Sequence, residues 1–150
     1  MIPQFKQYQG TFPYKTDSKN RVNVYPSWRP AQGEGISLMA SVSEGVNILK
    51  VLTDEAVNYR LERIEKHATD PKEESRLKTK LKRHLRDASV NEQGKLLIPR
   101  DLAAHAGISP DSDVMLSAAD SHFEIWNRAK YEEKFGTFAV PEIEDELGIF

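Results

Sequence analysis

The fold is decided by one stretch of the sequence, Thr16-Asp17-Ser18-Lys19-Asn20-Arg21-Val22-Asn23-Val24-Tyr25-Pro26. Aspartate and asparagine hydrogen-bond to nearby backbone and tolerate left-handed φ angles, so residues 17–20 are predicted to form a tight turn. Val22 and Val24 are two residues apart, which gives the strand after the turn one apolar face. The stretch therefore predicts a cationic turn followed by a half-buried strand.

The same order of residue types returns in Asn91-Glu92-Gln93-Gly94-Lys95-Leu96-Leu97-Ile98-Pro99. Gly94 takes the place of Asn20, and both residue types are suited to a positive φ angle. Lys95 takes the place of Arg21, so we interpret the chain as two related halves. The residues predicted to orient the two turns are Asp17, Asn20, Asn91 and Gly94.

The composition limits the classes of protein that the chain can belong to. Its 150 residues, 39% of them hydrophobic, are enough for one compact domain or for two small halves that share a core. The absence of cysteine excludes disulfides, thiolate metal sites and cysteine nucleophiles. No apolar run approaches the ~18 residues that a membrane span needs. We therefore expect a cytoplasmic protein without a membrane partner.

The distribution of charge matters more than the formal net charge of −2, which by itself argues against a nucleic-acid partner. Residues 131–150 hold six acids and one base, a local charge of −5, so residues 1–130 carry +3. Residues 1–30 hold five bases and one acid. Such segregation permits a basic face on an acidic protein, although cationic faces are often merely solvated.

Strands are expected in both halves of the chain. A strand within residues 1–14 is predicted to pair with Val22–Tyr25, and the apolar runs 36–42 and 46–52 flank a glycine-containing turn, which is typical of a β-hairpin. The second half is expected to contain strands at 96–98, 114–116 and 123–126 and short helices at 101–106 and 128–135. Beyond Pro141 the chain is acidic and is expected to be frayed.

Between the halves the periodicity becomes helical. Thr53 or Asp54 is a plausible N-cap for a first helix, whose apolar positions are Val57, Leu61 and Ile64. Asp70, Pro71 and Glu73 form a capping-box pattern that predicts a second helix over residues 71–87. The basic residues of this second helix could be a solvated surface, or they could face DNA or a neighbouring subunit.

The sequence contains little evidence for a catalytic or metal-binding site. The four histidines lie in separate segments, and no serine elbow, phosphate loop or dinucleotide fingerprint is present. A hydrolase that uses the tail carboxylates is possible in principle, but catalytic carboxylates need rigid support. We predict that the chain is not an enzyme and has no cofactor, metal or small-molecule substrate. The tail carboxylates are Glu142, Glu144, Asp145 and Glu146.

The cations of the first turn point to a nucleic acid. Lys19 and Arg21 are two residues apart, so on extended backbone both side chains project the same way. Asp17 could hold Arg21 by a salt bridge or could simply cap the turn. A row of such cations suits DNA phosphates, and arginine can bond bidentately to the O6 and N7 atoms of guanine.

These segments resemble, in order, the MraZ family of bacterial transcriptional regulators, whose members carry two SpoVT/AbrB-like repeats. The resemblance covers roughly residues 5–135. In the first half it is carried by Tyr8-Gln9-Gly10 and by residues 17–22. In the second half it is carried by three segments, residues 94–99, Leu102–Ile108 and Phe123–Trp126.

The resemblance implies an α+β, mainly β fold, in which two SpoVT/AbrB-like swapped-hairpin β-barrel halves are joined by a two-helix segment. The implied divisions are a first repeat at 5–52, a helical linker at 53–87, a second repeat at 88–135 and an acidic tail at 136–150.

The implied function is sequence-specific binding to double-stranded DNA by a ring-like homo-oligomer. The expected sites are repeated promoter sequences of the division and cell-wall gene cluster, so the protein would be associated with the nucleoid. Lys19 and Arg21 take the family's DNA-contacting positions, and Lys15 and Lys95 are expected to add phosphate contacts.

Five residues depart from the family pattern and bear on this expectation. Asn20 replaces the usual glycine, Thr16 takes a usually apolar place, and Pro13 interrupts the first strand, where it fits best at a sheet edge. In the second turn, Asn91 and Lys95 replace aspartate and arginine. The alternative to a DNA-binding regulator is therefore a ring scaffold or protein-interaction module whose DNA-binding face has decayed.

Overall fold

The computed structural model describes residues 5–136. In this part of the chain the strands are β1 (Thr11–Lys15), β2 (Arg21–Asn23), β3 (Ile36–Ser43), β4 (Val46–Thr53), β5 (Leu85–Ala88), β6 (Lys95–Leu97), β7 (Asp113–Ala118) and β8 (Phe123–Asn127). The helices are the 3-10 helix η1 (Pro26–Trp28) and the α-helices α1 (Asp54–His67), α2 (Pro71–Arg83), α3 (Arg100–His105) and α4 (Arg128–Phe135). None of these helices is long and apolar enough to cross a membrane.

A six-stranded antiparallel sheet forms most of the fold, with the strand order β1-β7-β8-β4-β3-β5. A separate two-stranded ribbon joins β2 to β6. The predicted β3–β4 hairpin is confirmed, and it turns through Glu44 and Gly45, both at positive φ as a tight hairpin turn requires. The expected α+β, mainly β class is thus confirmed, whereas the swapped-hairpin description of the halves stays a prediction.

The predicted partner of the first strand is wrong. β1 does not pair with residues 22–25. It pairs with β7, from Thr11 opposite Ser117 to Lys15 opposite Asp113, while β2 pairs with β6. The turn after β1 carries the chain out of the large sheet, so β1 is left as the edge strand beside β7 and β2 joins the ribbon. Side-chain alternation within a strand does not reveal which distant strand it joins.

Pro13 lies in this edge strand, as expected. The backbone of Gly10 and Thr16 bonds toward the β7 side, through Ala118 N–H to Gly10 O at 3.0 Å and Thr16 N–H to Ser112 O at 2.9 Å. Pro13 has the opposite parity, so its missing N–H falls on the open side of β1 and costs no ladder hydrogen bond. A proline there also hinders pairing with a further strand.

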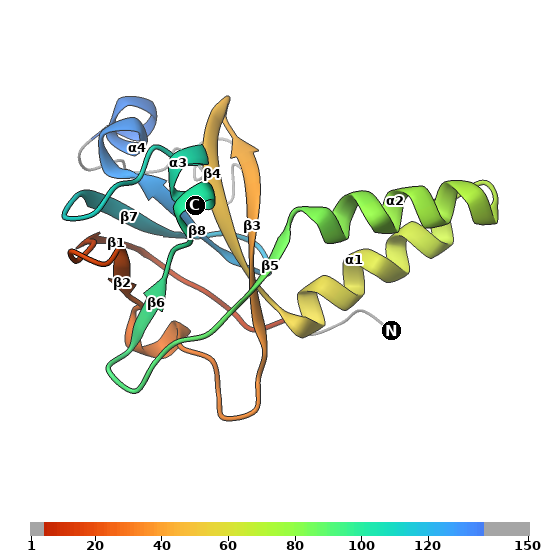
Figure 1. Ribbon diagram of the computed structural model, residues 1–150, viewed down its shortest axis with the longest axis horizontal. Coiled ribbons are helices and arrows are strands. Elements are labelled where there is room, and N and C mark those ends of the chain that lie inside the picture. The colour runs from red at the N-terminus through yellow and green to blue at the C-terminus, as the bar shows by residue number, and fades with distance from the viewer. Residues whose placement is uncertain (1–4, 137–150) are drawn as a thin grey trace, which may run out of the picture.

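The ribbon closes over one face of the six-stranded sheet and completes the core (Figure 1). Two-stranded ribbons are marginal by themselves in water, so this one depends on the apolar side chains that it buries. The ribbon's inward residues are almost fully buried and are Val22, Val24, Leu96 and Ile98. They share one cluster with sheet residues that include Leu38, Leu49, Leu116 and Ile125.

Tyr8, Trp28 and Phe123 add aromatic contacts to the same cluster. Trp126 lies instead in a second cluster with Ile48 and Met115. Phe123 and Trp126 of β8 are therefore core residues.

Helices α1 and α2 form an antiparallel hairpin that projects from the end of the sheet (Figure 1). The predicted caps are confirmed, because Thr53 Oγ1 accepts the N–H of Ala56 at 3.2 Å and Asp70 Oδ1 accepts the N–H of Glu73 at 2.8 Å. Glu73 Oε2 accepts the N–H of Thr69 at 3.0 Å, which places the reciprocal bond one residue before the cap.

The prediction of helix over residues 71–87 is wrong at its C-terminal end. α2 ends at Arg83, and Leu85–Ala88 form strand β5 along β3, with Leu85 opposite Met39. Leucines at positions 77, 81 and 85 keep a four-residue helical spacing beyond the end of α2. Leu85 is apolar because of its place in the sheet, so the spacing does not mark the end of the helix. Without β5 the edge of β3 would be unpaired.

The predicted helix at 128–135 is confirmed as α4, and the predicted helix at 101–106 corresponds to α3. The acidic tail, including the carboxylates from Glu142 onward, lies outside the described residues apart from Gly136.

Candidate nucleic-acid interface

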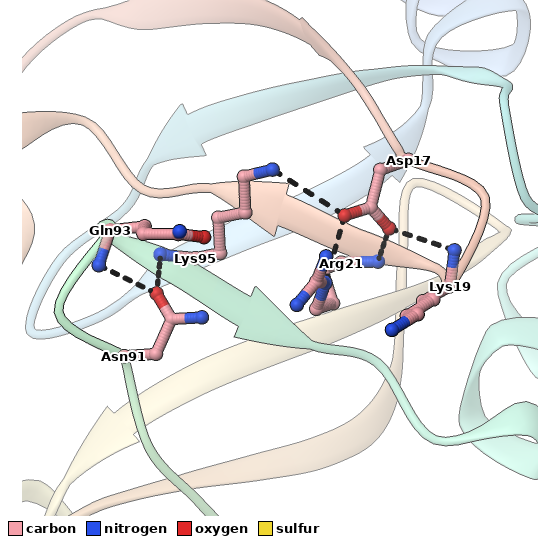
Figure 2. Close-up of polar contacts among 6 residues, drawn as sticks. All are labelled: Asp17, Lys19, Arg21, Asn91, Gln93 and Lys95. Atoms are coloured by element: carbon pink, nitrogen blue, oxygen red, sulfur yellow. Dashed lines mark hydrogen bonds and ion pairs between the residues drawn. The ribbon is translucent and has the colours of Figure 1, made fainter.

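The first turn is closed by the Asp17 carboxylate (Figure 2). Asp17 Oδ1 accepts the N–H groups of Lys19 at 2.9 Å and Arg21 at 2.8 Å. Backbone bonds from Asn20 N–H to Asp17 O (3.0 Å) and from Asp17 N–H to Arg21 O (2.9 Å) complete the loop. Asn20 has a φ of +60°, the left-handed conformation expected from the sequence.

The second turn has the same hydrogen-bond pattern with an amide in place of the carboxylate (Figure 2). Asn91 Oδ1 accepts the N–H groups of Gln93 at 2.9 Å and Lys95 at 3.0 Å. Gly94 N–H donates to Asn91 O and Asn91 N–H donates to Lys95 O, both at 2.9 Å. Gly94 has a φ of +79°. Asparagine therefore builds this turn without a charge.

Reciprocal backbone bonds tie the two turns to the ribbon. Val24 N–H donates to Gly94 O at 2.9 Å, and Ile98 N–H donates to Asn20 O at 3.0 Å. Each turn is thus fixed by the far end of the opposite strand. The two turns lie at opposite ends of the β2–β6 ribbon because its strands are antiparallel.

The ribbon has a buried inner face and an exposed outer face. Because side chains alternate along a strand, the residues flanking buried Val22 and Leu96 point outward. In the register of the ribbon, Arg21 lies opposite Leu97 and Asn23 lies opposite Lys95. We call this set the outer face of the ribbon: Arg21, Asn23, Lys95 and Leu97.

Asp17 gathers two of the cations on that face. Its Oδ2 lies 2.8 Å from Arg21 Nε and 3.5 Å from Lys95 Nζ (Figure 2). Asp17 therefore does both things that the sequence left open, since it caps the turn and holds Arg21. Within residues 5–136 the two Nη groups of Arg21 have no hydrogen-bond partner, so its terminal edge is free for a bidentate acceptor.

The same contacts keep Asp17 ionised. The backbone N–H of Arg21, followed by the Arg21 side chain and the N–H of Lys19, lowers the pKa of the Asp17 carboxyl from 3.8 to about 2, and partial desolvation opposes the shift. At neutral pH the carboxylate and its two cations carry a net charge of +1. The turn is therefore cationic even with its aspartate.

The other two predicted cations lie elsewhere. Lys19 is exposed at the tip of the first turn, and its side chain makes no ion pair within the described residues. Lys15 is exposed at the end of β1, opposite Asp113 of β7, and so lies outside the ribbon. The structure thus brings Arg21 and Lys95 together, places Lys19 beside them, and puts Lys15 on the large sheet next to an acid.

Sequence reasoning missed three residues of this surface. Arg29 donates through Nε to Val24 O at 3.0 Å, and its guanidinium lies against Gly94, which adds a cation at the second turn. Only the folded chain shows this contact. Asn23 and Leu97 of the outer face were also missed, although the alternation that exposes Arg21 and Lys95 exposes them too.

A groove of about 510 Å³ borders the ribbon between the first turn and α3. Lys19 and Arg100 contribute cations to its lining, and Leu97 contributes an apolar side chain from the outer face. Cations at the side of an exposed ribbon are suited to a phosphate backbone that runs past it.

Comparison with known proteins shows similarity to one family of transcriptional regulators. Residues 86–144 match the family described as "MraZ protein, putative antitoxin-like". A transcriptional regulator MraZ from Christiangramia forsetii is 28% identical over 128 residues, which cover 83% of this chain and 80% of the relative. One from Lachnoclostridium phytofermentans is 27% identical over 143 residues, 95% of this chain and 96% of the relative. One from Flavobacterium psychrophilum is 28% identical over 146 residues, 94% of this chain and 85% of the relative.

The chain is similar to MraZ proteins over most of its length. The resemblance drawn from the two turns and from Phe123–Trp126 is thereby confirmed. The MraZ family match begins in β5 and includes the second turn, and the Lachnoclostridium MraZ alignment covers enough of the chain to include both turns.

Proposed function

We propose that this chain is a sequence-specific DNA-binding transcriptional regulator that places the outer face of its β2–β6 ribbon in the major groove. The observation that carries the proposal is the ion cluster at Asp17, which holds Arg21 and Lys95 together on one exposed face of the ribbon. The major groove of B-DNA admits a two-stranded β-ribbon. The names of the relatives, transcriptional regulator MraZ, agree with this function.

Each cation has its own role in the proposal. Arg21, attached through Nε, presents its Nη edge to the O6 and N7 atoms of a guanine. Lys19, Lys15 and Lys95 contact phosphates, and Arg100 adds a cation where the backbone would pass along the groove. The four turn-orienting residues hold the cations in register and are Asp17, Asn20, Asn91 and Gly94.

The proposal includes two related repeats, residues 5–52 and 88–135, joined by a helical segment at 53–87 and arranged as swapped hairpins. The strand order supports this, because exchanging β1 with β5, β7 with β3 and β8 with β4 reverses the order of the sheet and leaves its pairings unchanged. The matching hydrogen bonds of the two turns support it as well.

We further propose a ring-like homo-oligomer that binds repeated promoter sites of the division and cell-wall gene cluster, with the protein associated with the nucleoid. A ribbon with few cations binds weakly. Several copies in one assembly would engage several sites on one duplex, and the linked contacts add avidity without new contacts in any one copy.

The test is a mobility-shift titration of wild type and Arg21→Ala on the DNA upstream of the protein's own coding sequence. Loss of one bidentate guanine contact should weaken binding by about 10- to 100-fold. Arg63→Ala is the matched control, because Arg63 is exposed on α1, where it contacts Tyr59 in the helical hairpin. Wild-type affinity should also fall steeply with added salt, because neutralised phosphates release counterions.

Unchanged binding by Arg21→Ala would remove Arg21 from the interface. A wild-type protein that oligomerises but ignores DNA at low salt would contradict the proposed function and favour the scaffold alternative.

A further inference from the structure

Leu97 is the unexplained residue of the outer face. Its side chain is 54% exposed, whereas the preceding residue of the strand, Leu96, is fully buried. Among the described residues the large exposed hydrophobic side chains are Val42, Leu97 and Phe135. Of these, Leu97 is the one that shares a face with Arg21 and Lys95.

The outer face consists of two cross-strand pairs of unlike chemistry. One pair combines Arg21 with Leu97, and the other combines Asn23 with Lys95. Residues two apart on a strand are separated by roughly 6.7 Å. Base pairs follow each other at about 3.4 Å, so with the ribbon along the groove the two pairs lie about two base-pair steps apart.

The two turns have the same hydrogen-bond pattern, but the strands that follow them have different outward side chains. Arg21-Val22-Asn23 and Lys95-Leu96-Leu97 occupy equivalent places after the two turns, yet one outward strand ends in an amide and the other in an aliphatic side chain. The two strands have equivalent backbone positions but different outward side chains, so the outer face of the ribbon is chemically asymmetric. On DNA, such a surface would suit an asymmetric sequence, which would fix the orientation of the protein.

On a duplex, one chemical group suits an exposed leucine flanked by cations. Arginine and lysine bring the ribbon to the polar floor of the major groove, where the 5-methyl group of thymine is the apolar contact. Burial of the leucine side chain against that methyl removes both from water. We infer that Leu97 is a specificity-determining residue that reads the 5-methyl group of a thymine in the major groove. This inference rests on the proposed DNA-binding function.

The experiment removes the methyl group and the leucine independently. The wild-type protein first selects its preferred site from a library of random duplexes. Each thymidine of the selected site is then replaced, one at a time, by deoxyuridine, which keeps the base pair and lacks the methyl. Affinities of wild type and Leu97→Ala are measured on every duplex. Val42→Ala is the matched control, since Val42 is equally exposed, at 57%, and lies on β3.

At one position or more, wild type and Val42→Ala should lose about fourfold in affinity when the methyl is absent, as expected for one buried methyl group. Leu97→Ala should bind the thymidine and deoxyuridine duplexes equally. Leu97 is exposed, so this variant should fold, and sedimentation should give it the wild-type mass.

Three results would overturn the inference while leaving DNA binding intact. They are a selected site without a sensitive thymidine, a deoxyuridine effect of the same size in Leu97→Ala, and a changed sedimentation mass that shows Leu97 between copies of the chain. Absence of wild-type binding to any duplex at low salt would instead contradict the proposed function itself.

Discussion

At the scale of the residue, Asp17 and Asn91 perform the same backbone task with different charges. Each accepts two backbone N–H groups through one side-chain oxygen. Only Asp17 adds an ion cluster, through its second oxygen. The comparison of the two turns shows that an amide is sufficient to form the turn. The charge of the Asp17 carboxylate is needed only for the ion pairs with Arg21 and Lys95.

Asp17→Asn should therefore fold and lose the part of the acid response that comes from Asp17. Because the folded-state pKa of Asp17 is about 2 and the ordinary value is 3.8, the ionised carboxylate stabilises the fold above about pH 3.8. This contribution is lost as the pH falls from there through about 2. Melting temperatures of wild type and Asp17→Asn, measured from pH 6 to pH 2, should converge as the pH falls. A constant difference between the two curves would contradict the ion cluster.

Gly94 is required for two separate reasons. Its φ is +79°, and a Cβ atom there would overlap the guanidinium of Arg29. Gly45 has a similar φ of +75° and open space where a Cβ would lie. A comparison of alanine substitutions at Gly45 and Gly94 therefore separates the cost of backbone strain from the cost of losing the contact with Arg29.

We expect Gly45→Ala to cost about 1–2 kcal/mol from the left-handed conformation alone. Gly94→Ala should cost about 1 kcal/mol more, because it displaces Arg29 from the Val24 carbonyl. Urea unfolding measures both. In an Arg29→Ala background the difference between the two alanine variants should shrink, and an undiminished difference would contradict the role given to Arg29.

At the scale of the element, the α1–α2 hairpin relies on its caps because it buries little. In the described chain α2 has no buried residue, and α1 has only Ala56. Its stability must come largely from capping and from contacts between the two helices, such as the 2.7 Å ion pair of Lys78 with Glu65.

Asp70→Ala should weaken α2 locally by about 1 kcal/mol, the typical cost of an N-cap aspartate. Amide hydrogen exchange should show protection in α2 reduced about fivefold, with β3 and β4 unchanged. Thr79→Ala, exposed within α2, is the control and should preserve or slightly raise protection. Equal protection in wild type and Asp70→Ala would mean that tertiary contacts hold the helix without its cap.

At the scale of the whole molecule, neither half supplies a complete set of strand partners. β1 needs β7 and β5 needs β3, while β2 needs β6. The core likewise takes its largest side chains from both halves. The halves should therefore fold together.

A fragment of residues 84–136 should not form a folded monomer. At low concentration it should lack cooperative unfolding, and any structure should increase with concentration, because a second copy would have to replace the missing strands. Circular dichroism over a dilution series, together with sedimentation, tests this. A folded monomer would contradict the interdependence of the halves.

Local chemistry in the sequence accounts for much of the site. Asp17, Asn20, Asn91 and Gly94 form the two turns through hydrogen bonds to residues within four positions in the chain, so residue type alone predicts these turns. The helix caps at Thr53 and Asp70 are local in the same way. These features of the fold could be predicted because their partners lie within a few residues.

Local sequence patterns were sufficient to predict the turns, the first residues of α1 and α2, the β3–β4 hairpin and the resemblance to the MraZ proteins. Only the folded chain shows that β1 pairs with β7, that Leu85 belongs to a strand, and that Arg21 and Lys95 share one carboxylate. The physical reason is that partners far apart in sequence are selected by the burial of both apolar faces together. That selection depends on the whole core, and no short stretch contains it.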